Sequence, residues 1–279
     1  MANLFRFLFA GVVAGGATMV ARSYLEQKPP GAPALWERTN HRGETISLLA
    51  GPAVTAGMTA GALVGGAGVS GAIASLGGGA FGLHDDLAED TSVRTKGLKG
   101  HLGALAQGEL TTGGLKVLGI GATAFVSSCG LNLPRKGRNA FDIVVDTALI
   151  AGTANFINLL DLRPGRAIKF VGASATLLAM AGANATAGAL VGTCAGIARN
   201  DLSEQDMLGD GGANAFGALL GHTFAARGSR PVRIVGLGAI VALTLASEKV
   251  SFSKVIAQTP WLNRIDMLGR RAPVTTESN

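Results

Sequence analysis

Residues 45–84 read TISLLAGPAVTAGMTAGALVGGAGVSGAIASLGGGAFGLH, a stretch of 40 positions between Glu44 and Asp85 without a charged side chain. A helix needs about 20 apolar residues to cross the hydrocarbon core of a bilayer, so this stretch alone is long enough for two crossings. It therefore predicts a protein that is embedded in a membrane.

The composition of the whole chain agrees with this prediction. Hydrophobic residues make up 48% of the 279 positions, which excludes intrinsic disorder. The 42 glycines follow no three-residue period, which excludes a collagen-like repeat, and two cysteines are too few for a disulfide scaffold. The net charge of +6 suits an anionic membrane surface. With two Trp and one Tyr, the chain has no basic stripe bearing aromatic residues, so we expect no nucleic-acid partner.

Apolar segments between charged or proline-containing stretches predict an all-α, polytopic integral membrane protein with about nine transmembrane helices. The 29 charge-free residues from Phe170 to Ala198 are divided at Gly182–Asn184, because a single helix of that length would be exceptional. The first segment can also be interpreted as a signal peptide. We expect a polytopic domain over residues 1–262 and a cytoplasmic tail over residues 263–279. The expected crossings are residues 4–22, 46–65, 67–83, 114–130, 139–158, 167–182, 184–199, 211–226 and 232–247.

The distribution of charges predicts the orientation. With the N-terminus outside, the cytoplasmic loops hold 17 of the 24 Lys and Arg residues, as expected because these side chains are retained on the cytoplasmic side. Of the 18 Asp and Glu residues, 16 lie in these cytoplasmic loops or at their edges. The other two, Asp142 and Asp146, lie in the fifth crossing. For this pair we favour an inter-helix hydrogen bond over a proton path.

Small residues recur every four positions at Gly57, Gly61 and Gly65. This spacing lets two helix backbones approach closely inside lipid. We favour close helix packing over a lumen or groove lined by small residues.

Two polar motifs lie at the expected cytoplasmic ends of crossings. Asp85 and Asp86 end the third crossing, where adjacent carboxylates repel unless a cation such as Mg²⁺ or a proton compensates. The alternative is a charged collar that stops the helix at the interface. Asp210 precedes two glycines and the eighth crossing, where the helix N-terminus favours a phosphate. The alternative there is an ordinary N-cap.

A third motif, Asn155, Asn158 and Asp161, follows the fifth crossing. Its spacing aligns two amides and a carboxylate along one helical face, from which they can bind a nucleotide or a metal. The alternative is a polar helix end.

The order of the three motifs resembles the polyprenyl-phosphate N-acetylhexosamine-1-phosphate transferases, the family that includes phospho-N-acetylmuramoyl-pentapeptide transferase (glycosyltransferase family 4). That family has an Asp-Asp pair at the end of the third crossing, Asn-x-x-Asn-x-x-Asp after the fifth and Gly-Asp-x-Gly before the eighth. Residues 95–98, Thr-Lys-Gly-Leu, are similar to the sequence that follows the aspartate pair in the muramoyl-pentapeptide enzymes. The resemblance covers roughly residues 1–262.

The resemblance implies a Mg²⁺-dependent enzyme of the cell (inner or plasma) membrane that acts in cell-envelope glycan synthesis. Such an enzyme transfers a sugar-1-phosphate from a UDP-sugar to a polyprenyl phosphate and releases UMP. These two substrates and the membrane are the expected partners, and homodimer formation is left open. The resemblance assigns Asp85, Asp86 and Asp161 to catalysis, Asp210 and Asp86 to the metal, and Asn155 and Asn158 to substrate binding. We expect Lys96 and Lys99 to draw in the phosphates, with a basic loop near anionic lipid as the alternative. In place of the family's histidines, we expect Arg264, or else Arg270 or Arg271, to contact the diphosphate.

The chain departs from the family pattern at three places. Pro164 stands where the family has a second acid, and Met207 stands where an aromatic residue stacks on uracil. Residues 259–271 contain no histidine, although the family has a histidine-rich motif there. Two alternatives therefore stay open. One is a degenerate relative that binds lipid phosphate or a partner enzyme without chemistry, and the other is a transporter or channel, suggested by Asp146 and the small-residue helices.

Overall fold

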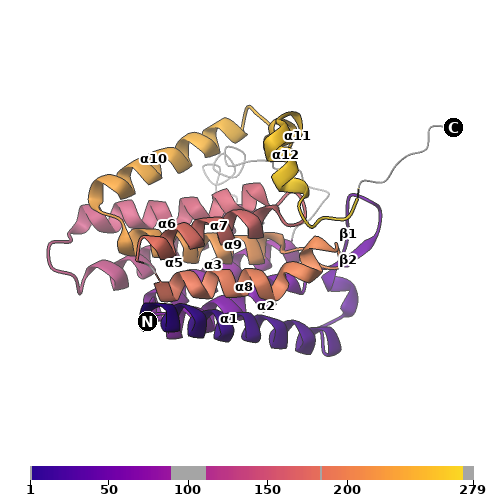
Figure 1. Cartoon of the computed structure of the whole chain (residues 1–279), viewed down its shortest axis with the longest axis horizontal. Helices are drawn as coiled ribbons and strands as arrows, with labels where there is room; N and C mark the ends of the chain where they lie inside the picture. Colours follow the sequence, from indigo (N-terminus) through magenta and orange to yellow (C-terminus); the bar gives the residue numbers. More distant parts are fainter. Residues whose placement is uncertain (1, 89–110, 183, 273–279) are drawn as a thin grey trace.

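The computed structural model describes residues 2–88, 111–182 and 184–272. The described chain is mostly helical, as predicted, and its long helices run side by side in a bundle (Figure 1). A small antiparallel hairpin, in which Glu37 pairs with Ser47, was not predicted. The elements are α1 (Ala2–Gln27), η1 (Pro33–Trp36), β1 (Glu37–Thr39), β2 (Thr45–Ser47), α2 (Ala50–Val64), α3 (Gly68–Ala88), α5 (Thr112–Asn132), α6 (Ala140–Leu160), α7 (Arg166–Met180), α8 (Asn184–Leu202), α9 (Gly209–Arg227), α10 (Arg230–Ser247), α11 (Phe252–Gln258) and α12 (Pro260–Met267).

Four of the described helices, α1, α5, α6 and α10, are long and apolar enough to span a membrane. A separate helix overlaps each of the nine segments expected to cross, but α2 begins only at Ala50 because residues 45–47 pair in β2. Helices α2 and α7 have 15 residues each. That is fewer than the roughly 20 residues of a typical crossing, so the count of nine crossings stays a prediction. The orientation also stays a prediction, because only the distribution of charges supports it.

The division expected at Gly182–Asn184 is confirmed. Helix α7 ends at Met180 and α8 begins at Asn184. Gly182 has a φ of +96°, a left-handed backbone conformation that residues with a side chain rarely adopt. The long charge-free run therefore folds as two helices.

Helix α1 packs along α8 through glycines on both helices. A Cβ atom added to Gly192 would lie 2.0 Å from the carbonyl oxygen of Gly11, and one added to Gly188 would lie 2.1 Å from that of Phe7. These positions leave no room for a side chain, so the two backbones touch. Gly57 of α2 contacts α1 in the same way, which confirms the close-packing interpretation of the small-residue spacing.

We expect Gly192→Ala to lower the free energy of unfolding by about 1–3 kcal/mol, because its Cβ would meet the rigid backbone of Gly11. The matched control is Gly121→Ala in α5, where an added Cβ meets nothing within 4 Å. Helix propensity alone favours Ala at such a position by up to about 1 kcal/mol. Thermal unfolding in detergent compares the two variants, and equal midpoints would contradict the α1–α8 packing.

Helix α9 lies inside the bundle and packs against α2, α3 and α6. Nearly all of its residues are buried, and most of them are Gly or Ala, which permit close approach. A Cβ added to Gly82 of α3 would lie 2.3 Å from the carbonyl oxygen of Asp210. This contact brings the end of α3 directly against the start of α9.

The segment after α10 returns to the bundle end that carries the β1–β2 hairpin (Figure 1). Asp266 of α12 accepts hydrogen bonds from Arg166 of α7 at 2.8 Å and from Arg270 at 2.7 Å. The domain boundary expected at residue 262 therefore falls inside α12, whose ion pairs tie it to the bundle. The rest of the expected tail, residues 273–279, lies outside the described residues.

Candidate functional site

Asp86 joins the end of α3 to the start of α9. Its carboxylate accepts hydrogen bonds from the backbone N–H groups of Asp210 at 3.0 Å and Gly211 at 2.9 Å. The first N–H groups of a helix lack partners within the helix and carry partial positive charge, so the carboxylate caps α9. Burial, together with repulsion from Asp210, raises the pKa of Asp86 to about 7, although the two N–H bonds oppose this shift. Ligation of Mg²⁺ by Asp86 stays a prediction.

Lys116 of α5 bridges Asp85 of α3 and Asp210 of α9. Its Nζ atom donates to Oδ2 of Asp85 at 2.5 Å and also to Oδ2 of Asp210. Two of the predicted site residues thus meet at one ammonium group. Lys116 was not among the predicted site residues. The signal that could have found it is a charged residue at the start of an apolar helix.

The donor set around Lys116 fits a divalent cation that also binds a substrate. Mg²⁺ usually takes one or two protein carboxylates and fills its coordination with water and phosphate oxygens. Asp85 and Asp210 supply two carboxylates at one point. Among residues 2–88, 111–182 and 184–272, no group of three or more His, Cys, Asp or Glu side chains is arranged to hold a metal ion. A Mg²⁺ ion held by Asp210 and one neighbouring carboxylate would therefore need phosphate oxygens as further ligands.

An apolar groove of about 300 Å³ reaches Lys116 between α5, α6 and α10. Most of its lining is apolar, with polar groups contributed by Lys116, Asn155, Asn214 and Thr244. Lys116 contacts Asp210, and Asn214 follows Asp210 by one turn of α9, so this polar part of the groove lies next to the carboxylates. Helix α10 is largely exposed, with Arg233 as its buried residue, so the outer wall of the groove faces the surroundings of the bundle.

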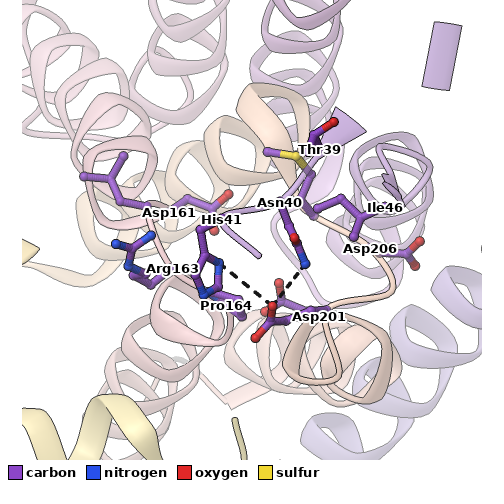
Figure 2. A pocket seen from close by; sticks show the side chains of 12 residues that line it. Thr39, Asn40, His41, Ile46, Asp161, Arg163, Pro164, Asp201 and Asp206 are labelled. Atoms are coloured by element: carbon purple, nitrogen blue, oxygen red, sulfur yellow. Dashed lines mark hydrogen bonds and ion pairs between the residues drawn. The ribbon is translucent and has the colours of Figure 1, made fainter. Parts of the chain in front are cut away.

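A second, polar cavity of about 170 Å³ lies beside the β1–β2 hairpin (Figure 2). Its lining includes Asp161 at the end of α6, Asp201 of α8 and Asn40 of the hairpin. Asn40 donates to Glu204 at 3.1 Å, which ties the hairpin to the loop after α8. Burial, followed by repulsion from Asp201, Asp210 and Asp86, raises the pKa of Asp161 well above its ordinary value. The cavity therefore gathers several carboxylates beside the loop that leads into α9, where Glu204 pairs with Arg42 and Asp206 with Arg22.

The predicted row of Asn155, Asn158 and Asp161 does not line a single cavity. Asn155 lines the apolar groove, Asp161 lines the polar cavity, and Asn158 is half-buried at the end of α6. Pro164 and Met207, the two departures from the family pattern, also line the polar cavity.

Of the three predicted cationic site residues, one is exposed and two fall outside the described residues. Arg264 is exposed on α12 and forms no ion pair with the part of the chain that the structure describes. Its neighbours Arg270 and Arg271 pair with Asp266 and Glu44. Lys96 and Lys99 fall outside the described residues.

Asp142 and Asp146 lie near the other end of α6 from Asp161, in a buried ion-pair network. Arg233 of α10 donates to Asp146 at 2.5 Å and to Asp142 at 2.6 Å. Asn132 of α5 donates to Asp146 at 2.9 Å. The favoured inter-helix hydrogen bond is thus confirmed, and the acid that suggested a transporter is held in fixed contacts.

Comparison of the sequence with protein-family models and with curated proteins gives no match. What the site can do follows from its own groups. Two carboxylates share one ammonium, and the apolar groove and the polar cavity lie nearby.

Proposed function

We propose that the protein transfers a sugar-1-phosphate from a UDP-sugar to a polyprenyl phosphate, in a cell (inner or plasma) membrane. The products are UMP and a lipid-diphosphate-sugar. The observation that carries this proposal is the meeting of Asp85, Lys116 and Asp210 beside an apolar groove. The groove would hold the chain of a lipid phosphate, and Lys116, whose ammonium already pairs with Asp85 and Asp210, would contact its head together with a Mg²⁺ ion. The proposal includes nine crossings, with the N-terminus outside and the site cytoplasmic.

In the proposed reaction, an oxygen of the lipid phosphate attacks the β-phosphorus of the UDP-sugar. A P–O bond forms there, and the bond from the β-phosphorus to the oxygen that bridges the two phosphates breaks, so UMP leaves with the electron pair. Asp85 orients the lipid phosphate and accepts its proton, while Lys116 offsets the charge of the approaching anions. Asp210, with Asp86 beside it, would hold a Mg²⁺ ion, which neutralises and orients the diphosphate when bound.

The polar cavity is the proposed site of the uridine. Asp161 and Asp201 can accept hydrogen bonds from ribose hydroxyls or from the base. Met207 lines the same cavity, and its polarizable thioether can pack against a base in place of an aromatic ring. Asn158, at the end of α6, would contribute to nucleotide binding, while Asn155 lies in the apolar groove. Lys96, Lys99 and Arg264 would draw in the phosphates.

The test is an assay of UMP release by the purified full chain in detergent, with Mg²⁺, a polyprenyl phosphate and a panel of UDP-sugars. We expect release with one or a few sugars, and none when the lipid phosphate is omitted or Mg²⁺ is chelated. The lipid product should gain the mass of one sugar phosphate. Silence across the panel in a protein that still binds the lipid would reject the transferase.

A second candidate is a relative that binds lipid phosphate or a partner enzyme without chemistry. One observation favours it, because the ammonium of Lys116 lies between the two carboxylates that a Mg²⁺ ion would use. This candidate predicts co-purified lipid phosphate and no turnover. Any sugar-phosphate transfer would exclude it.

A further inference from the structure

The amide of Asn214 is buried without a partner for its nitrogen. The residue is 1% exposed, and within the described chain its Nδ2 atom has no hydrogen-bond partner. Buried polar groups in proteins are almost always hydrogen-bonded, and leaving a donor unpaired costs stability. A residue of this kind is explained if a ligand supplies the missing acceptor.

The position of Asn214 indicates what such a ligand would be. It lines the α5–α6–α10 groove together with Lys116 and Asn155, while the remaining lining is almost entirely apolar. An ammonium and two amides offer several N–H donors, which together suit an oxyanion such as a phosphate. The apolar walls suit a hydrocarbon chain. The groove therefore matches a molecule with a long apolar chain and a phosphate head.

We propose that Asn214 is a specificity-determining residue for the acceptor, and that its amide donates a hydrogen bond to the phosphate of a lipid monophosphate seated in the α5–α6–α10 groove. The class of lipid rests on the proposed function, but binding through Asn214 does not require transfer. The ammonium of Lys116 already pairs with Asp85 and Asp210, whereas the Asn214 amide nitrogen has no acceptor within the described residues and acts only at hydrogen-bond distance. Asn214 thus fixes where the phosphate sits relative to Asp210, one turn away on α9.

The test is Asn214→Leu, which keeps a similar volume and removes the donor. We expect two changes in opposite directions. The midpoint of thermal unfolding in detergent stays the same or rises, because a buried unpaired donor is removed. The affinity for radiolabelled polyprenyl monophosphate falls by roughly 10- to 100-fold, because a hydrogen bond to a charged group is lost. Parallel binding experiments use the prenol without phosphate and inorganic phosphate alone.

Thr193→Val is the matched control. The hydroxyl of Thr193 is also buried and has no hydrogen-bond partner among the residues that the structure describes, but it lies on α8 and does not line the groove. We expect Thr193→Val to keep the affinity of the wild type. Unchanged affinity in Asn214→Leu, or an equal loss in both variants, would overturn the proposal. So would equally tight binding of the prenol, or inorganic phosphate bound as tightly as the lipid with the same dependence on Asn214.

The two proposals fail separately. Loss of lipid phosphate binding in Asn214→Leu, with no UMP release by the wild type for any sugar, would leave the role of Asn214 standing and reject the transferase. If Asn214→Leu still transfers the sugar phosphate with an unchanged KM for the lipid, the transferase proposal stands and the role of Asn214 is rejected.

Discussion

Asp210→Asn is expected to abolish Mg²⁺-dependent UMP release, with a loss of kcat/KM on the order of 10³-fold or more. Asp210 is one of two carboxylates that meet at Lys116 beside the groove. A neutral amide is a much weaker ligand for Mg²⁺ than a carboxylate, so the charge that develops on the departing UMP would lose its compensation. The measurement is UMP release at saturating lipid phosphate, with the sugar that the panel identifies.

The same substitution should leave the protein folded, which separates chemistry from stability. Two carboxylates now share the single ammonium of Lys116, and after the change Lys116 and Asp85 remain as a balanced pair. The cap of α9 is also kept, because Asp86 accepts from the backbone N–H of residue 210 rather than from its side chain. Glu26→Gln, an exposed carboxylate at the end of α1, is the control and should keep full activity. Release by Asp210→Asn at the rate of the wild type would refute the assignment of the site.

The helices could be predicted from the sequence because the bilayer makes hydropathy decisive. Backbone polar groups have no water to bond in hydrocarbon, so an apolar segment of sufficient length forms a helix whatever its neighbours are. The break between α7 and α8 followed from the same argument. By contrast, residues 37–45 were predicted only as part of a charged loop and residues 46–47 as the start of the second crossing, since strands of three residues are too short to show an alternating pattern.

The side-chain contacts of the site were predicted only in part. Asp85, Asp86 and Asp210 were singled out because carboxylates at the end of an apolar segment are costly without compensation. Their partner Lys116 is 31 residues from Asp85 and 94 from Asp210 in the sequence, and only the packing of α3, α5 and α9 brings the three together. The missing partner of Asn214 is a property of packing in the same way. A local sequence pattern does not indicate which helices pack against each other.

The other prediction with a large effect concerns the opposite end of the bundle, where Asp146→Ala is expected to lower the free energy of unfolding by about 3–5 kcal/mol. Asp146 is fully buried and accepts from Arg233 and Asn132. Without Asp146, the buried guanidinium of Arg233 would have Asp142 as its remaining carboxylate partner within the described residues, and Asp142 also pairs with Arg230. A buried charge that loses its partner costs more than the pair contributed. The measurement is the thermal midpoint and the yield of monodisperse protein in detergent.

Asp161→Ala, at the other end of α6, is the control. Asp161 forms no ion pair within the described residues, and burial and repulsion from Asp201 already disfavour the charged form of its carboxyl group. We expect its thermal midpoint to equal or exceed that of the wild type. The double variant Asp146→Leu with Arg233→Met should recover much of the stability that Asp146→Ala loses, since well-packed apolar residues can replace a buried ion pair. If Asp146→Ala instead unfolds at the midpoint of the wild type, the network does not hold α5, α6 and α10 together. The proton path, the alternative role of Asp146, would then be favoured.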